Sequence, residues 1–320
     1  MKTRTIHRLA ALVLLALGLV ATSGCGPDRA AVGAPEGAAR RPVVGVSLLN
    51  SSAEFIASLD LAMRDEARKL GVELIVNDAQ LSAERQIQQV EGFVAQGVDA
   101  VILNPCQVDG SSPAVDAARR AGIPLINVNS ETRSQPTAFV GSLDEEAGRM
   151  AMDYIATRLN GKGNVAIIEG PMGQAAQAKR FRGAQEVLAR FPELKVVATQ
   201  PADWDRAKAI SLMENWLQAR RSGIDAVFAE NDEMAMGAVL ALEQAGLKQR
   251  VVVIGVDGIA DALAAVKAGR LDATIFQDAE GQGRTAVAVA LQIVRRRPFT
   301  RETLIPFRLV TRENVAEFSP

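Results

Sequence analysis

The sequence predicts an α/β protein of two similar lobes, each with a parallel β-sheet between layers of helices. Short apolar segments alternate with helical segments from Val43 onward, which is typical of parallel sheets. The alternation runs through two successive halves of the chain. The halves also share short patterns: Val-Asp-Ala-Val at 98–101 precedes Asn-Pro at 104–105, and Ile-Asp-Ala-Val at 224–227 precedes Asn-Asp at 231–232.

Length and composition agree with two globular domains. At 320 residues a single core no longer grows with chain length. The formal net charge is −1, so the chain lacks the excess of basic residues that is typical of nucleic-acid-binding proteins. The only histidine is His7, and two cysteines cannot build a metal cage. We therefore expect no histidine-based catalysis, no metal site and no cofactor.

The first residues predict an export leader. Residues 1–8 are basic, residues 9–21 are apolar, and Thr-Ser-Gly at 22–24 precedes Cys25. Small residues directly before a cysteine resemble a bacterial lipoprotein signal, although leucine is usual where Thr22 stands. A plain signal peptide or a short N-terminal anchor is the alternative. The lipoprotein hypothesis makes residues 1–24 the removed signal peptide and Cys25 the lipidated residue. It places the protein in the periplasm or on the outer face of the cytoplasmic membrane.

Residues 25–42 are rich in Gly, Ala, Pro and Arg and show little periodicity. This composition predicts a flexible tether between the anchor and the first strand.

In the first half of the folded body, Phe55, Leu59 and Met63 recur at helical spacing. The expected helices there are Glu54–Leu70, Ser82–Gln96 and Pro113–Ala121. The expected strands are Val43–Leu49, Val72–Asn77, Ala100–Leu103, Leu125–Val128 and Thr137–Val140.

The second half repeats this scheme. The expected strands are Val165–Glu169, Lys195–Thr199, Ala226–Ala229, Val251–Val256 and Ala273–Phe276. The expected helices are Asp144–Leu159, Ala175–Arg190, Asp205–Arg220, Glu233–Ala245, Ile259–Ala268 and Gly281–Arg297.

Polar side chains follow the expected strands at their carboxyl ends. They are mostly amides, and neither a GxGxxG nor a GxxxxGK[ST] pattern follows a strand. Ligands of open α/β sheets bind at this edge, where amides can donate to and accept from adjacent hydroxyl groups. A neutral polyhydroxylated ligand is therefore expected. The residues concerned are Asn104, Asn127, Asn129, Asn231, Asp257 and Gln277.

Several segments together resemble the bacterial ribose-binding protein family, the periplasmic receptors of monosaccharide ABC importers. The resemblance extends from about Val43 to Leu309 and implies a type I periplasmic binding fold. In that fold two Rossmann-like lobes are joined by a three-strand hinge. The implied N-terminal lobe is 43–142 plus 278–304, and the implied C-terminal lobe is 143–277 plus 305–320. The segments are Asn104-Pro105, Gln200–Asp205, Asn231–Ala238, Gly255–Gly258 and Ala273–Gln277.

The resemblance also implies a sugar-binding site between the lobes. Phe55 and Trp204 would stack on the sugar ring. Arg180 and Asp257 would make charge-assisted hydrogen bonds in a nearly neutral site. Glu131 lies close enough to Asn129 in sequence to join the pocket. The full set is Phe55, Asn104, Asn129, Glu131, Arg180, Trp204, Asn231, Asp257 and Gln277.

Each of these residues also has a structural interpretation. Phe55 fits the core face of its helix, Asn104 a turn before proline, and Asn231 a helix N-cap. Arg180 could be a solvated residue, and a slip of the alignment would select Arg182 instead.

Departures from the ribose binders affect the identity of the ligand. Those proteins typically carry Asp-Arg where this chain has Asn129-Ser130, and aromatic residues where it has Ile56 and Val256. Another pentose, a hexose or a cyclitol therefore competes with ribose. Cys106 is expected to be buried rather than reactive.

The expected function is that of a monomeric, lipid-anchored receptor that delivers a monosaccharide or cyclitol to an ABC permease and has no enzymatic activity. The alternative is a ligand-sensing receptor that hands a sugar or autoinducer to a chemoreceptor or sensor kinase. The missing histidine and the absence of a nucleophile elbow argue against an α/β enzyme.

Overall fold

The computed structural model describes residues 40–220 and 223–318. The predicted leader, Cys25 and residues 26–39 of the tether lie outside the described residues. Residues 41–320 form one compact unit. Among the residues described, no helix combines the length and the apolar composition that a membrane span requires.

The first sheet has six parallel strands in the order β11-β5-β4-β3-β1-β2. Its strands are β1 (Val43–Leu48), β2 (Glu73–Asp78), β3 (Ala100–Leu103), β4 (Leu125–Val128), β5 (Ala138–Gly141) and β11 (Glu302–Leu304).

The second sheet repeats this topology in the order β12-β10-β9-β8-β6-β7, with only β12 antiparallel to its neighbour. Its strands are β6 (Lys162–Glu169), β7 (Glu193–Pro201), β8 (Ala226–Ala229), β9 (Val252–Asp257), β10 (Ala273–Phe276) and β12 (Arg308–Thr311).

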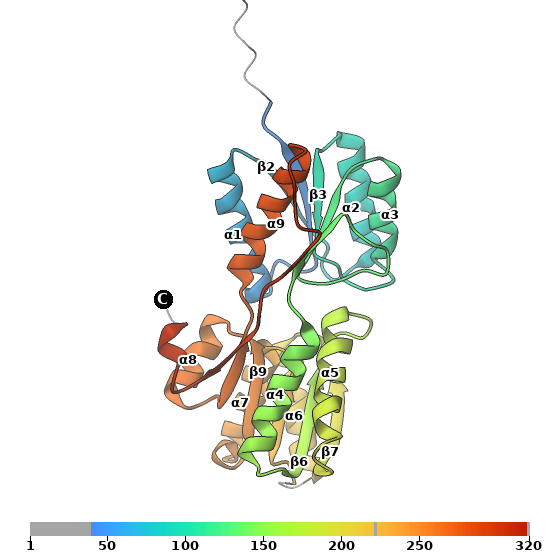
Figure 1. Ribbon diagram of the computed structural model, residues 1–320. Helices are drawn as coiled ribbons and strands as arrows, with labels where there is room; N and C mark the ends of the chain where they lie inside the picture. The colour runs from blue at the N-terminus through green and yellow to red at the C-terminus, as the bar shows by residue number, and fades with distance from the viewer. Residues whose placement is uncertain (1–39, 221–222, 319–320) are drawn as a thin grey trace, which may run out of the picture. The chain divides into compact units, whose positions relative to one another are not determined.

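Helices cover both faces of each sheet (Figure 1). In the first lobe α1 packs against α9 and α2 against α3, while in the second α4 packs against α5 and α6 against α7. The helices are α1 (Glu54–Leu70), α2 (Ala83–Gln96), α3 (Ser112–Arg120), α4 (Asp144–Arg158), α5 (Ala175–Leu188), α6 (Arg206–Arg220), α7 (Asp232–Gln244), α8 (Ala260–Ala268) and α9 (Ala279–Val294). The short 3₁₀ turns are η1 (Lys248–Arg250) and η2 (Val315–Glu317).

The chain passes between the two sheets three times: after β5, after β10, and between β11 and β12. The predicted fold class of two parallel α/β lobes is confirmed. The lobe boundaries remain a prediction, which these three crossings support.

Two edge strands escaped prediction. β11 and β12 have only three and four residues and carry exposed charged residues, so they lack the apolar runs that mark the inner strands. The last long helix begins earlier and ends earlier than expected. The Asp278 side chain caps it by accepting a hydrogen bond from the Gly281 amide, and it ends at Val294 rather than Arg297.

Two glycines bring α4 and α5 unusually close together, and this contact positions the site. A Cβ atom at Gly148 would lie 1.9 Å from the backbone oxygen of Arg180. A Cβ atom at Gly183 would lie 2.0 Å from the backbone oxygen of Glu145. Because larger residues cannot fit, the glycines allow α5 to carry Arg180 within reach of Asp144 at the start of α4.

Candidate ligand-binding site

The carboxyl ends of the strands of both sheets lie next to one another, and three hydrogen-bonded contacts join the lobes there. The Val108 amide donates to the Gly173 backbone oxygen over 3.0 Å, and the Ala260 amide donates to Glu54 Oε1 over 2.8 Å. Lys179 Nζ lies 2.6 Å from Glu131 Oε1.

Between these contacts lies a small cavity of about 60 Å³, lined from both lobes. The first lobe contributes Leu49, Ala53, Phe55, Ile56, Asn129 and Ser130, and the second contributes Gln174, Ala176, Arg180, Trp204, Asn231, Asp257 and Gln277.

The wall from the first lobe is neutral. Phe55 lies in the first turn of α1 and is 8% exposed, so its ring belongs both to the cavity wall and to the core. Asn129 follows β4 with a left-handed backbone, φ 67°. Asn is one of the few residue types that adopt this conformation readily, and here the turn places Asn129 at the cavity.

Asn104 lies one layer behind this wall and is fully buried. Its Nδ2 donates to the Val128 backbone oxygen over 3.2 Å and to Asn129 Oδ1 over 3.3 Å. Its Oδ1 accepts from the Leu49 amide over 3.3 Å. Both of its donors are therefore engaged within the protein, and Asn104 joins the ends of β1 and β4 and orients Asn129.

The wall from the second lobe is organised around Arg180, which is 3% exposed. Its Nε donates to Asp144 Oδ1 over 2.9 Å, its Nη2 donates to Gln277 Oε1 over 3.1 Å, and its Nη1 donates to the backbone oxygen of Glu230. Asp257 Oδ1 lies 3.9 Å from Nη1. Since Arg182 is exposed and pairs with Glu145, the cavity arginine is Arg180, as the resemblance implied.

More carboxyl groups surround Arg180 than the sequence indicated. Burial is the main cause that raises the pKa of Asp144, and it raises those of Glu230 and Asp257 well above the usual range, although Arg180 opposes all three shifts. Burial also raises the pKa of Asp232 to about 6, against hydrogen bonds from Thr274 and from two backbone amides. The site is therefore not one arginine with one aspartate. It is one arginine with several carboxyl groups, for which burial favours the neutral form.

The pKa of Arg180 is itself raised. Burial alone would lower it, but the combined charges of Asp144, Asp257 and Glu230 outweigh that effect. The guanidinium group therefore stays charged in the cavity wall.

Gln277 faces the cavity with an unused donor. Its Oε1 accepts from Arg180, whereas its buried Nε2 has no hydrogen-bond partner among the described residues. Buried polar groups are rarely left unpaired, so this amide is placed to donate to an oxygen atom within the cavity.

Trp204 closes the other side of the cavity from a strained turn. Asp203 and Trp204 both have left-handed backbones, with φ 57° and 61°. The indole Nε1 donates to Gln174 Oε1 over 2.8 Å, and the Arg180 guanidinium carbon lies 5.7 Å from the ring centroid. A Cβ atom at Gly170 would lie 2.1 Å from the ring, so glycine there makes room for the indole. Strain of this kind persists where the surrounding contacts determine the conformation.

Asn231 has both of the roles that its sequence position allows. Its Oδ1 accepts from the Met234 amide over 3.0 Å and so caps α7, while the residue also lines the cavity. Asp257 ends β9 with φ 131°, and the chain turns away through Gly258 at φ 73°.

Seven of the nine candidates therefore line one cavity, and two do not. Asn104 lies behind the wall, and Glu131 lies where the lobes meet, paired with Lys179. Sequence reasoning missed Gln174, which orients Trp204 and lines the cavity. The signal available was its place in the loop after β6, whose end lies at the same edge as the ends of β8 and β9.

Two other sequence expectations concern residues outside this cavity wall. Cys106 is 2% exposed, and burial raises the pKa of its thiol to about 12, so it is not a reactive thiolate. Among residues 40–220 and 223–318, no group of three or more His, Cys, Asp and Glu side chains could hold a metal ion.

Comparison with known proteins identifies the fold. The family described as the periplasmic binding protein domain matches residues 44–298. A putative rhizopine-binding protein of Rhizobium meliloti is 39% identical over 88% of this chain and 94% of its own. The ribose import binding protein of Bacillus subtilis is 34% identical over 94% of this chain and 98% of its own.

A solved ABC transporter solute-binding protein of Bacillus halodurans C-125 with bound myo-inositol superimposes with a TM-score of 0.85 at 42% identity, covering 88% of this chain and 98% of that one. The two lobes therefore form a type I periplasmic binding fold, and the chain belongs to the periplasmic binding protein family that includes the ribose import binding proteins.

Proposed function

We propose that this chain is the lipid-anchored receptor of an ABC importer and binds a neutral cyclitol or monosaccharide in the cavity between its lobes. The family supports solute binding for ABC import, and the side chains of the cavity support the ligand class. The observation that carries the ligand class is Gln277 Nε2, which has no hydrogen-bond partner among the described residues. It belongs to a cavity that Arg180, Asp257, Phe55 and Trp204 also line.

The hydrogen-bonding inventory of the cavity suits hydroxyl groups. Arg180 and the Nε2 of Gln277 can only donate, an ionised Asp257 can only accept, and the amide of Asn129 can do both. A hydroxyl group also does both, so each can be matched by one hydroxyl of a polyol. An anionic ligand would add a charge beside buried carboxyl groups, which is unfavourable.

Ligand binding would also hold the lobes together. Phe55 and Asn129 belong to the first lobe, whereas Arg180, Asp257 and Gln277 belong to the second. A ligand that bonds to both sets stabilises the arrangement in which the lobes touch. The size of this stabilisation is the difference between its binding free energies for that arrangement and for one with the lobes apart. A permease can then recognise the ligand-loaded form from the surface that the two lobes share.

Among polyols we propose a cyclitol before ribose. The solved Bacillus halodurans C-125 protein, 42% identical to this chain, has myo-inositol bound. In addition, this chain has the neutral pair Asn129-Ser130 where ribose binders typically have a charged Asp-Arg pair. An inositol, the cyclitol type of that neighbour's ligand, carries a hydroxyl on every ring carbon. It can therefore use neutral amides on the side of the first lobe while the second lobe supplies the charged bonds.

Calorimetry with myo-inositol, D-ribose and xylitol tests the ligand class. We expect binding, with myo-inositol tighter than D-ribose. In Trp204→Ala the best ligand should bind about 5- to 150-fold more weakly, because a buried ring contact is worth about 1–3 kcal/mol.

Trp216→Phe is the control. Trp216 lies on α6, is 9% exposed and packs in the hydrophobic core rather than at the cavity. This substitution should leave the affinity unchanged. Binding that is equally tight in Trp204→Ala would show that this ring does not contact the ligand, and tighter binding of D-ribose would overturn the preference for cyclitols.

The anchor and the absence of catalysis need separate tests. Cys25→Ser should abolish metabolic labelling by a radioactive fatty acid; labelling that persists would exclude lipidation at Cys25. Ligand recovered after prolonged incubation should be chemically unchanged. A product that accumulates in proportion to protein concentration would make the chain an enzyme.

A further inference from the structure

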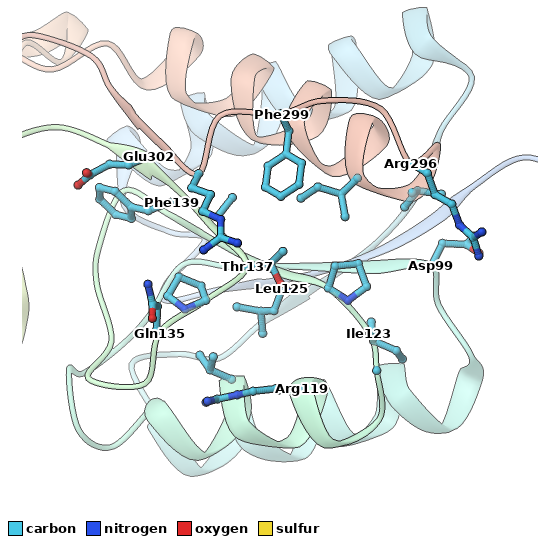
Figure 2. Close-up of a pocket in the computed structure, with 18 residues that line it drawn as sticks. Asp99, Arg119, Ile123, Leu125, Gln135, Thr137, Phe139, Arg296, Phe299 and Glu302 are labelled. Atoms are coloured by element: carbon cyan, nitrogen blue, oxygen red, sulfur yellow. Dashed lines mark hydrogen bonds between the residues drawn. The ribbon is translucent and has the colours of Figure 1, made fainter.

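A hollow larger than the ligand cavity lies away from it, at the amino ends of the strands of the first lobe. It is a groove of about 950 Å³ between the end of α3, the starts of β4 and β5, and the end of α9. Figure 2 shows Leu125 and Thr137 in its middle, with Arg119 on one side and Phe299 and Arg296 on the other. Its floor is apolar and its rim is basic.

Arginine residues gather at this end of the lobe. Arg119, Arg296 and Arg301 line the groove, and other arginines adjoin it in the sequence. All of them are exposed. We call this surface the arginine face, and it consists of Arg119, Arg120, Arg295, Arg296, Arg297 and Arg301.

Most of these arginines have no carboxylate ion-pair partner among the described residues. Arg119 pairs with Asp116, but no ion pair within residues 40–220 and 223–318 involves the other five. The groove contains the acids Asp99 and Glu302, and Asp99 Oδ2 accepts from the Val43 amide over 2.7 Å. The arginine face, with six arginines against Asp99, Asp116 and Glu302, therefore carries an excess of positive charge.

The corresponding end of the second lobe is neutralised. There Arg158 lies 3.4 Å and Lys248 2.8 Å from carboxylate oxygens of Asp272, and Arg190 pairs with Asp153. The two lobes share one topology, so the excess of unpaired cations at one end is not a property of the fold.

Helix dipoles explain only part of this excess. Cations in the last turn of a helix interact favourably with its negative end, which accounts for Arg119 and Arg120 in α3. Arg296, Arg297 and Arg301 lie beyond the end of α9. Arg296 has φ 52°, a left-handed position that glycine usually takes, as Gly71 and Gly97 do after α1 and α2.

The folded body begins at this same end. Val43 opens β1 beside Asp99 of the groove, and Arg41 lies two residues before Val43 in the chain. Cys25 stands 41 − 25 = 16 residues before Arg41. A fully extended chain of this length reaches at most about 55 Å, so the proposed anchor would keep the arginine face within that distance of a membrane.

We propose that the arginine face binds the surface of an anionic phospholipid bilayer. Guanidinium groups match phosphate oxygens with paired hydrogen bonds, and each basic residue near an anionic bilayer contributes about fivefold to the partition. The apolar floor around Leu125 and Phe299 accommodates the less polar part of a lipid headgroup region. This interaction holds the first lobe against the membrane on the side away from the ligand cavity.

Co-sedimentation with vesicles tests the proposal without the anchor. Residues 41–320 form one compact unit, so a chain from Gly26 onward retains the folded body and lacks Cys25. It should bind vesicles that contain phosphatidylglycerol and not vesicles of pure phosphatidylcholine. Raising the salt from about 0.05 M to about 0.5 M should release it, because the Debye length falls severalfold.

Two double variants with the same charge change locate the binding surface. Arg296→Glu with Arg301→Glu should weaken binding to the anionic vesicles at least about 25-fold and leave ligand affinity unchanged. Lys195→Glu with Lys267→Glu is the control and should weaken it far less. Both lysines are exposed residues of the second lobe, and neither forms an ion pair with another residue in the described part of the chain.

An equal loss of vesicle binding in both double variants would mean that only the net charge of the protein matters, and would overturn the proposal. So would equal binding to both kinds of vesicle, or binding to a soluble polyanion with none to vesicles. Because the chain tested has no Cys25, these outcomes are independent of whether the protein is lipidated.

Discussion

The two lobes share one topology but contribute different chemistry to the cavity between them. The first lobe provides Phe55, Asn129 and Ser130, none of which carries a charge. The second provides Arg180 with buried carboxyl groups around it, among them Asp257. The difference shows that one copy of the fold can hold a prearranged electrostatic site while the other supplies neutral contacts.

The charged wall belongs to the core of its lobe as much as to the cavity. Arg180 is held by contacts with α4, the end of β8 and the end of β10, all within the second lobe. Its geometry therefore does not depend on the first lobe. The neutral wall is held by Asn104 behind it, a hydrogen-bonded amide without charge. Removal of a side chain from the charged wall should consequently lower the free energy of unfolding more than removal of one from the neutral wall.

The largest effect is expected for Arg180→Met, which keeps an unbranched apolar side chain but removes the charged guanidinium group. Asp144, Glu230 and Asp257 then lack their cation, and removal of one partner of a buried ion pair costs about 3–5 kcal/mol. Urea unfolding should show this loss at pH 8 and a smaller one at pH 5, where the carboxyl groups can take up protons.

Arg182→Met is the matched control for that variant. Arg182 is exposed and pairs with Glu145, so its loss should cost at most about 1 kcal/mol. Similar stability losses in the two variants would show that Arg180 is not the centre of the charged wall.

Asp257→Asn should stabilise the ligand-free protein in a pH-dependent way. Burial raises the pKa of Asp257 above its unfolded value, so the folded state binds more protons and stability falls as the pH rises from about 4 through the raised pKa. The amide removes that loss. At pH 8 we expect a gain of about 1–3 kcal/mol, the cost of an incompletely paired buried group, and near pH 4 no gain.

Thermal unfolding across this pH range checks the prediction, and ligand affinity provides a second measurement. If Asp257 accepts from a ligand hydroxyl, Asp257→Asn should bind more weakly although it is more stable. A gain of the same size at pH 4 and pH 8 would contradict the role of ionisation.

Asn129→Asp tests the neutral wall. It adds a negative charge to the side of the first lobe, across the cavity from Asp257, while the hydrogen bond from Asn104 can still form. We expect little change in stability and about a fivefold loss of affinity for a neutral polyol, the worth of one hydrogen bond of about 1 kcal/mol.

Calorimetry measures this affinity, and a double variant that also has Ser130→Arg should recover part of it because the charges balance. Unchanged affinity in Asn129→Asp would place this side chain outside the contact with the ligand.

The alternation of strands and helices was enough to predict both lobes, because inner strands are continuous apolar runs. The same signal is absent from β11 and β12, whose few residues lie at sheet edges and are partly exposed. Helix limits were shifted where a side chain sets the cap, as Asp278 does for α9.

The site was predictable only as far as strand ends determine it. Strand ends brought Asn129 to the carboxyl edge of the first sheet and Asn231, Asp257 and Gln277 to that of the second. They do not determine which way each side chain points. Asn104 turns into the protein, and so does the carboxyl group of Glu230, next to the cavity residue Asn231. Such orientations depend on backbone angles and on neighbours from distant segments, and periodicity carries neither.

The smallest effect concerns Glu131, a charged residue of the first lobe that lies near the cavity without lining it. Glu131 pairs with Lys179 across the lobes, and these side chains are 40% and 22% exposed. Exposed pairs are worth about 0.2–1 kcal/mol, so Lys179→Met should weaken ligand binding by at most about fivefold, and added salt should reduce the difference from wild type. Arg182→Met removes a pair within the second lobe and should leave ligand affinity unchanged.

Since Glu131 does not line the cavity, Glu131→Gln should match Lys179→Met. A much larger loss in Glu131→Gln than in Lys179→Met, measured by calorimetry at two salt concentrations, would mean that Glu131 contacts the ligand, as the sequence predicted, and that the first wall is not neutral.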